Sequence, residues 1–257
     1  MAFCAHGLDR IGLAGDPASP VHRLDPRAKV LGLVAVTLVA VSAPPARWPV
    51  YAGCLGVLAV VAAVGRVPAL ELWRRARLVL GLVLLVAVFV PFVRPGGEAY
   101  ALGPLTVHAA GLTVLAGVAA KAAIGTLSAV LLGATTTFPA VLAALAALRV
   151  PRLLVLIAGF MYRYLFVIAD ELGRMRAGLA ARGYRPRTAL GAGALGRLAA
   201  ALFLRTYGRG ERVHRAMLAR GYAGAMPLAA PLVARRADVL FVVLVLAVLV
   251  ALRVAAV

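Results

Sequence analysis

The stretch RLLVLIAGFMYRYLFVIADELGRMRAGLAAR, residues 152–182, runs for 31 residues without a proline and is followed by a glycine. An uninterrupted run of this kind predicts one long helix, which at 1.5 Å per residue would extend about 46 Å. The first half of the run is apolar and the second half is basic. It therefore fits neither a simple membrane span nor a loop, and the organisation of the chain depends on where such a helix lies.

The end of this stretch occurs twice in the chain. The pentapeptide AARGY at residues 180–184 is matched by LARGY at residues 218–222, and a second proline-free run, residues 188–222, leads up to it. Glycine adopts the left-handed conformation that stops a helix. The two copies therefore predict two long helices, each with an arginine in its last turn.

Helix capping accounts for each copy on its own, because a basic residue near a helix C-terminus complements the helix dipole and glycine is common just beyond it. Both copies also carry apolar residues on one helix face, three and seven positions before the arginine: Leu179, Met217, Met175 and Val213. Matching helix ends suit the two equivalent grooves of a symmetric dimer, where an arginine can donate several hydrogen bonds. We therefore interpret the two copies as docking elements for a dimeric partner.

The composition indicates a membrane protein. Hydrophobic residues make up 63% of the 257, the mean hydropathy is +0.97 and the net charge is +19. Soluble domains are typically about 45–50% apolar. The basic excess fits the clustering of Lys and Arg in cytoplasmic segments better than a nucleic-acid surface, since a soluble nucleic-acid binder has no use for repeated long apolar runs.

Five apolar segments predict transmembrane helices, at about residues 30–43, 50–64, 78–93, 109–133 and 238–251. The first helix is expected to begin near Pro26, since proline suits a first helical turn, and the third to follow the basic cluster WRRAR at 73–77. Basic residues before the first span and between the second and third place the N-terminus in the cytoplasm. Five spans then place the C-terminus outside. No apolar signal sequence precedes the first span, which is expected to direct insertion itself.

These features predict an all-α polytopic membrane protein in four parts: a cytoplasmic segment at 1–29, transmembrane helices at 30–136, a cytoplasmic or interfacial coupling domain at 137–236, and a fifth transmembrane helix at 237–257. From Arg149 to Arg236 there are 16 arginines and 3 acidic residues, so this part is expected in the cytoplasm. A sixth span over 153–169 is the competing topology. We favour a helix that lies in the membrane plane or is partly immersed, packed against the other spans, because a span would place Arg163 within lipid.

Four motifs, in this order, resemble the transmembrane T component of energy-coupling factor (ECF) transporters, and within it the CbiQ proteins of cobalt or nickel type: HRLDPRAK at 22–29, TTTFPAVLAAL at 135–145, FMYRYLFVIADE at 160–171 and the two Ala-Arg-Gly copies. The resemblance implies a non-catalytic scaffold in the inner membrane of a prokaryotic cell. Its two coupling helices would dock into a pair of ABC-type ATPase subunits, which bind ATP and Mg, and would hold a separate substrate-binding membrane subunit. The implied docking residues are Ala181, Arg182, Gly183, Ala219, Arg220 and Gly221, with Leu179 and Met217 beside them.

The sequence offers no catalytic or metal site of its own. Neither of its two lysines follows a glycine, so no Walker A loop is present and any ATP is expected on a partner. The four histidines and two cysteines are scattered and predict no metal or cofactor site. The adjacent Asp170 and Glu171 diverge on a helix, so a local pair with Arg174 is expected in place of acid–base chemistry.

Lys121 stands in the fourth predicted span, where the family tends to have an arginine. A lone lysine at membrane depth is expected to bond a buried carbonyl or carboxylate, and this structural role is favoured over a role in transport. The alternative function is a self-contained secondary transporter or channel. Such a protein would need internal repeats and several polar residues along a pathway, and the spans offer only Lys121 and no repeat.

Overall fold

The computed structural model describes residues 19–45, 47–87, 99–102, 105–184, 192–224 and 235–254. The chain divides into two compact units, Met1–Ala144 with Leu232–Val257, and Leu145–Pro231. The first unit is a helix bundle, and the second holds two long helices. The prediction of an all-α polytopic membrane protein is confirmed; a short antiparallel hairpin, β1 (Ala99–Leu102) with β2 (Leu105–His108), is the exception among the described residues.

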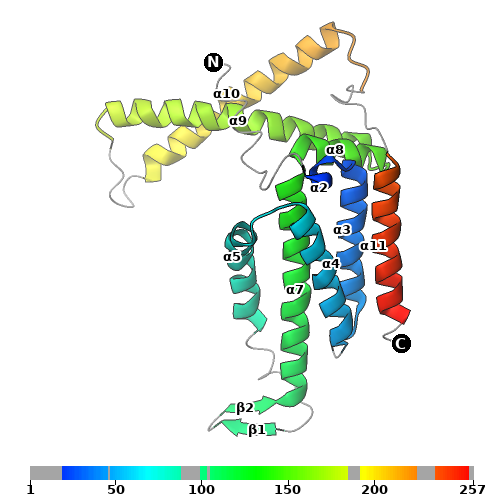
Figure 1. Ribbon diagram of the computed structural model, residues 1–257. Coiled ribbons are helices and arrows are strands. Elements are labelled where there is room, and N and C mark those ends of the chain that lie inside the picture. The colour runs from blue at the N-terminus through cyan, green and yellow to red at the C-terminus, as the bar shows by residue number, and fades with distance from the viewer. Residues whose placement is uncertain are drawn as a thin grey trace. The chain divides into compact units, whose positions relative to one another are not determined.

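The bundle is built from α2 (Pro20–Arg23), α3 (Pro26–Ser42), α4 (Trp48–Val64), α5 (Ala69–Ala87), α7 (Ala109–Thr135), α11 (Arg236–Val254) and most of α8 (Phe138–Ala147), as Figure 1 shows. The first long helix begins at Pro26, as predicted. The side chain of Asp25 caps it by accepting a hydrogen bond from the Arg27 N–H at 2.8 Å, which satisfies a backbone donor of the first turn. The fourth predicted span ends at Thr135, also as predicted.

The helix of the third predicted span starts before the predicted apolar segment. Helix α5 begins at Ala69, nine residues before the predicted start at Leu78, so the WRRAR cluster is helical. Neither glycine nor proline interrupts residues 69–80, and Arg75 pairs with Glu71 one turn earlier at 2.9 Å. The basic cluster therefore does not end the helix. Residues 88–93 of the predicted span lie outside the described residues.

Two lysines show that α3 and α7 run in opposite directions. Near the start of α3, Lys29 Nζ donates to the carbonyl oxygen of Thr135 at the end of α7, at 2.9 Å. Near the other end of α3, Lys121 Nζ donates to the carbonyl oxygen of Val41, also at 2.9 Å. The two contacts fix the register of an antiparallel pair.

Helices α3 and α11 run in the same direction, because both of their ends are joined. The Asp25 N–H donates to Asp238 Oδ1 at 2.7 Å where the two helices begin, and Arg253 donates to Ser42 Oγ where they end. It follows that α7 ends, and α11 begins, at the end of the bundle where α3 begins. The segment between them leaves the bundle and returns to it at that same end.

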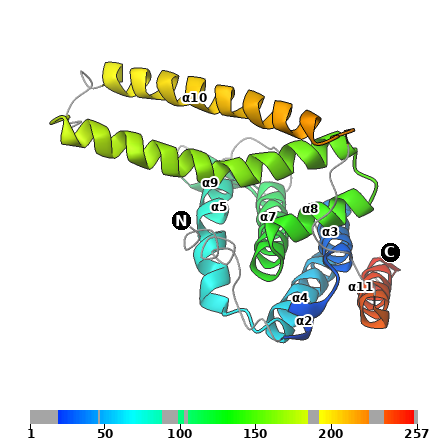
Figure 2. The same cartoon turned by 90° about the horizontal axis from the view of Figure 1, so that it is seen from above.

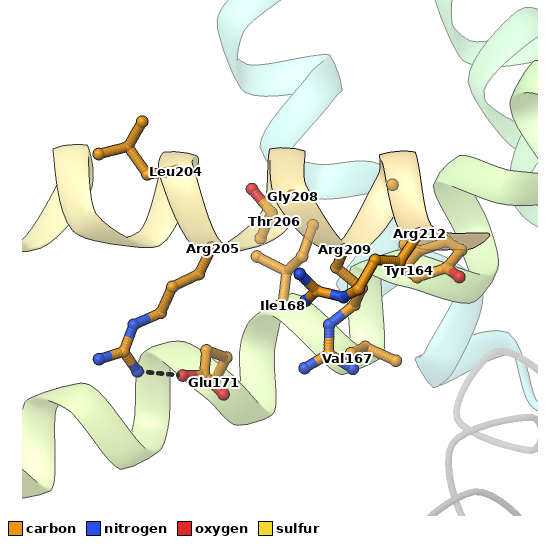
Figure 3. Close-up of a pocket in the computed structure, with 11 residues that line it drawn as sticks. Tyr164, Val167, Ile168, Glu171, Leu204, Arg205, Thr206, Gly208, Arg209 and Arg212 are labelled. Carbon is orange, nitrogen blue, oxygen red and sulfur yellow. Dashed lines mark hydrogen bonds and ion pairs between the residues drawn. The ribbon is translucent and has the colours of Figure 1, made fainter. Parts of the chain in front are cut away.

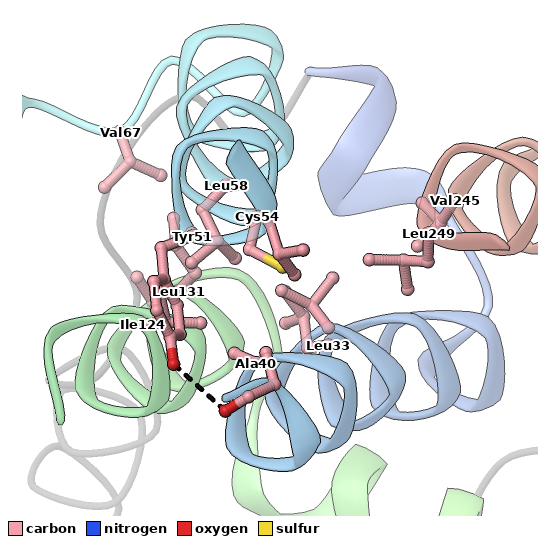
Figure 4. Packing of buried hydrophobic residues seen from close by; sticks show 14 residues of the cluster. Leu33, Ala40, Tyr51, Cys54, Leu58, Val67, Ile124, Leu131, Val245 and Leu249 are labelled. Carbon is pink, nitrogen blue, oxygen red and sulfur yellow. Dashed lines mark hydrogen bonds between the residues drawn. The ribbon is translucent and has the colours of Figure 1, made fainter. Parts of the chain in front are cut away.

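The core of the bundle lies between α3, α4, α7 and α11 (Figure 4). Each of these helices contributes fully or almost fully buried side chains, which are Leu33, Val36, Tyr51, Cys54, Ile124, Leu131, Val245 and Leu249. The Tyr51 hydroxyl meets its polar requirement by donating to the Ala43 carbonyl oxygen at 3.1 Å. Apolar packing therefore holds this part of the bundle together.

By length and composition, three helices of the described residues could cross a membrane: Gly111–Thr135, Arg152–Ala181 and Arg236–Val254. The helices Trp48–Val64 and Phe138–Ala147 are apolar but shorter. Two of the three long helices coincide with predicted spans. The third, Arg152–Ala181, includes residues 153–169, which we expect to lie in the membrane plane. Its length and composition would also allow a span, and its location therefore stays a prediction.

Candidate functional site

The second unit contains the two long helices predicted from the proline-free runs. Helix α9 extends over Arg152–Ala181 and has 30 residues, and α10 extends over Ala192–Ala219 and has 28. The first half of α9 is apolar, and both helices carry exposed arginines. Figure 1 shows α10 crossing α9, and in Figure 2 the end of α9 and the start of α10 lie on the same side of the crossing.

Side-chain contacts show that the pair is antiparallel. Glu171 of α9 accepts a hydrogen bond from Arg205 of α10 at 2.7 Å, near the middle of both helices. On one side of this contact the cleft between the helices brings Leu179 of α9 to Ala194 of α10. The two Arg-Gly ends therefore lie at opposite ends of the pair, about 16 Å beyond Glu171 on α9 and about 22 Å beyond Arg205 on α10 at 1.5 Å per residue.

The two helix ends have the same hydrogen-bonded cap. In α9, the Tyr184 N–H donates to the Leu179 carbonyl at 3.1 Å and the Gly183 N–H to the Ala180 carbonyl at 3.0 Å. In α10, the corresponding donors and acceptors are Tyr222 with Met217 and Gly221 with Leu218, both at 3.0 Å. Gly183 and Gly221 have φ of +79° and +77°, the left-handed conformation that this Schellman cap requires.

The cap accounts for more of the repeat than the glycine alone. The residue three positions before the arginine supplies the carbonyl, and the tyrosine supplies the N–H; in this type of cap those two positions also commonly pack against each other. The arginine enters the cap only through its backbone. Among the described residues, neither the exposed Arg182 side chain nor the exposed Arg220 side chain has a bonded partner, so capping leaves both guanidinium groups available.

The remaining predicted docking residues differ in exposure. Ala181, Gly183, Ala219 and Gly221 are exposed beside the arginines, whereas Leu179 and Met217 are half-buried. Leu179 and Arg182 both line the cleft between α9 and α10. A direct role of Leu179 and Met217 in docking stays a prediction.

Glu171 binds two arginines. The local pair with Arg174, predicted from the helical spacing, is confirmed at 2.6 Å. The second partner, Arg205 on the other helix, was missed, because a contact between residues 34 positions apart leaves no periodic signal. The Glu171 side chain is only 15% exposed, so its two oxygens tie together the region where the helices meet.

A buried polar cluster at the start of α3 was also missed. Lys29 is only 3% exposed, and its ammonium donates to the carbonyl oxygens of His22 and Thr135. Asp238, 5% exposed, accepts hydrogen bonds from the backbone N–H groups of Asp25 and Arg235. The HRLDPRAK motif therefore joins α2, α3, α7 and α11. The charged residues of the motif do not by themselves predict this structural role.

Lys121 donates to the Val41 carbonyl oxygen, the kind of partner expected for it. The described residues contain no group of three or more His, Cys, Asp or Glu side chains that could hold a metal ion. His108 lies in the hairpin, and nothing is concluded about its side chain.

The chain combines a bundle of apolar helices with a pair of long, arginine-rich helices. These features define its class, a polytopic membrane protein. The family model described as CbiQ, cobalt transport protein, matches residues 17–229 of the 257, which includes all four motifs. The chain therefore belongs to the CbiQ family of cobalt transport proteins. No curated protein matches the chain with significant similarity.

Proposed function

We propose that this chain is the coupling subunit of an ATP-driven importer of the ECF type, with cobalt, or the chemically similar nickel ion, as its substrate. ATP would be bound and hydrolysed by a pair of ABC-type ATPase subunits docked on the ends of α9 and α10. Their conformational change would move the helix pair, and the pair would move a separate substrate-binding membrane subunit. Such coupling requires different contacts in the two nucleotide states.

The observation that carries this proposal is the repetition of one cap at two helix ends. Each cap holds an arginine at the same position relative to a left-handed glycine, and each arginine side chain is exposed. Because the helices are antiparallel, the two arginines point to two separate places and not to one shared site. Two similar helix ends at separate positions would fit two similar binding grooves. A dimer of ATPase subunits with one fold provides two such grooves.

The directions of the bundle helices support a cytoplasmic location for α9 and α10. Among the described residues, the bundle end at which α3 and α11 begin and α7 ends carries Arg23, Arg27, Lys29, Arg66, Arg235 and Arg236, whereas the opposite end carries Arg47, Lys121 and Arg253. Basic residues concentrate on the cytoplasmic side of membrane proteins. The segment that holds α9 and α10 is connected to that basic end at both of its own ends. We therefore propose a cytoplasmic N-terminus, cytoplasmic coupling helices and a C-terminus outside.

Charge reversal of the two arginines tests the proposal. We expect Arg182→Glu with Arg220→Glu to abolish co-purification of an ABC-type ATPase, identified by its ATP hydrolysis, while the chain remains monodisperse in detergent. The matched control is Arg176→Glu with Arg215→Glu, which reverses two exposed charges on the same helices and should retain the ATPase. Retention of the ATPase by the first variant at the wild-type level would refute docking through these arginines.

A further inference from the structure

A second cleft lies between α9 and α10, on the other side of the Glu171–Arg205 contact from Arg182. It has a volume of about 470 Å³ and is lined by residues of both helices. Figure 3 shows the side chains of Arg209 and Arg212 reaching over Val167 and Ile168. The cleft therefore combines two cationic groups with an apolar surface.

Three arginines line this cleft, and among the described residues Arg209 and Arg212 have no counter-ion, whereas Arg205 pairs with Glu171. Glu171 is the acidic residue that lines it, and its two carboxylate oxygens are already bonded to Arg174 and Arg205. Among the described residues, neither Arg209 nor Arg212 forms an ion pair or a side-chain hydrogen bond. Two neighbouring guanidinium groups without a carboxylate produce a local positive potential, which favours binding of an anion from outside.

The chemistry of the cleft selects the kind of anion. Guanidinium groups donate paired hydrogen bonds to phosphate oxygens, so a phosphate suits Arg209 and Arg212. Val167 and Ile168 are the last part of the apolar run 153–169, which continues along α9 with the exposed Leu165 and Met161. A free phosphate would leave this apolar surface unused, whereas a phospholipid presents a phosphate and hydrocarbon together.

We propose that this cleft binds the headgroup of an anionic phospholipid from the cytoplasmic leaflet. Arg209 and Arg212 hold the phosphate, and Val167 and Ile168 pack against the glycerol and the first acyl carbons. The site rests on the proposed cytoplasmic placement of α9 and α10 but is separate from the ATPase-docking ends at Arg182 and Arg220. Lipid bound there would hold the helix pair against the membrane surface.

Native mass spectrometry of the whole purified chain, released from dodecyl maltoside without any ATPase, tests the site. The probes are palmitoyl-oleoyl-phosphatidylglycerol, the corresponding phosphatidylcholine and inorganic phosphate. Each basic residue near an anionic headgroup contributes a factor of about five in affinity, so Arg209→Gln with Arg212→Gln should bind phosphatidylglycerol about 30-fold more weakly. The control Arg176→Gln with Arg215→Gln removes the same charge outside the cleft and should bind within about twofold of wild type.

Two further variants separate the roles of charge and apolar surface. Arg209→Lys with Arg212→Lys should recover only part of the phosphatidylglycerol affinity, because lysine keeps the charge but not the paired hydrogen bonds, and Ile168→Gln should lower the affinity although no charge changes. The proposal is overturned if the double glutamine variant binds phosphatidylglycerol as wild type does, if phosphatidylcholine binds wild type equally well, or if inorganic phosphate occupies the site with equal affinity. Because no ATPase is present, these outcomes do not depend on whether docking at Arg182 and Arg220 occurs.

Discussion

Glu171 and Arg205 stand 34 residues apart in the sequence, and their side chains lie 2.7 Å apart across the two long helices. The same carboxylate also binds Arg174. The contact determines which parts of α9 and α10 face each other. It therefore also determines the separation of the two helix ends that carry Arg182 and Arg220. It therefore connects the packing of the helix pair to the proposed docking.

Replacement of Glu171 by Gln should loosen the helix pair without unfolding it. The variant keeps the shape of the side chain and removes its charge, so that Arg174 and Arg205 each lose their ionic partner. Ion pairs with exposed arginines contribute modestly, and we expect backbone amide exchange in the middle of α10 to become faster by less than about tenfold. Glu211→Gln, which breaks the exposed pair with Arg215 within α10, is the control and should leave exchange near Arg205 unchanged.

The two capping glycines should each matter to docking, although neither would touch the partner through a side chain. An alanine at 183 or 221 must adopt a left-handed conformation, which costs about 1 kcal/mol, or the cap must open and redirect the arginine. We expect Gly183→Ala with Gly221→Ala to reduce ATPase capture severalfold. Gly178→Ala is the control, because it lies inside α9 with open space around its Cβ position, and should stabilise the helix by about 0.5–1 kcal/mol. Full capture by the double variant would mean that the cap geometry does not position the arginines.

The two lysines of the chain should differ strongly in their contribution to stability. Lys29→Met leaves the carbonyl oxygens of His22 and Thr135 without a donor inside the bundle, which should lower the free energy of unfolding by about 2–3 kcal/mol. Lys121→Met removes one partly exposed hydrogen bond to Val41 and should cost less than about 1 kcal/mol. Thermal unfolding in detergent measures both. If both variants lost the same free energy of unfolding, the claim that the buried hydrogen bonds of Lys29 contribute more than the single bond of Lys121 would be contradicted.

Cysteine labelling tests the location of α9. In a chain without Cys4 and Cys54, a cysteine at Gly193, whose Cβ position faces open space, should be labelled by an impermeant maleimide only after the membrane is opened. A cysteine at Val254, at the exposed end of α11, should be labelled from outside. Labelling of Gly193→Cys from outside in intact cells would show that α9 spans the membrane, as its length and composition allow.

Local signals in the sequence predicted the helix ends well. Helix starts and ends could be predicted because proline and glycine affect the backbone within a few residues of their position. The informative signals are proline at 26, glycine at 183 and 221, and the proline-free run from 152 to 181. At α5 the basic cluster lies inside the helix, although the apolar span was expected to follow it. Charge decides on which side of a membrane a segment lies, but it does not interrupt helical hydrogen bonds.

The contacts that build the candidate site could not be predicted in the same way. The pair of Asp25 with Asp238 joins residues 213 positions apart, and Glu171 with Arg205 joins two helices. Contacts of this kind depend on which helices become neighbours, and no spacing within the chain records that. The apolar residue three positions before each arginine was interpreted as docking surface, whereas the structure shows that its carbonyl belongs to the cap. The exposed arginine is the part of the repeat that the cap does not explain.

The stoichiometry of the complex tests the central claim most directly. Native mass spectrometry of the chain, purified with its ABC-type ATPase, should give two ATPase subunits for each copy of the chain, and no ATPase on the variant Arg182→Glu with Arg220→Glu. Each single reversal should weaken the complex, because one of two equal docking ends remains. A wild-type complex with one ATPase subunit, or a double reversal that still carries two, would contradict the account of two equivalent docking ends.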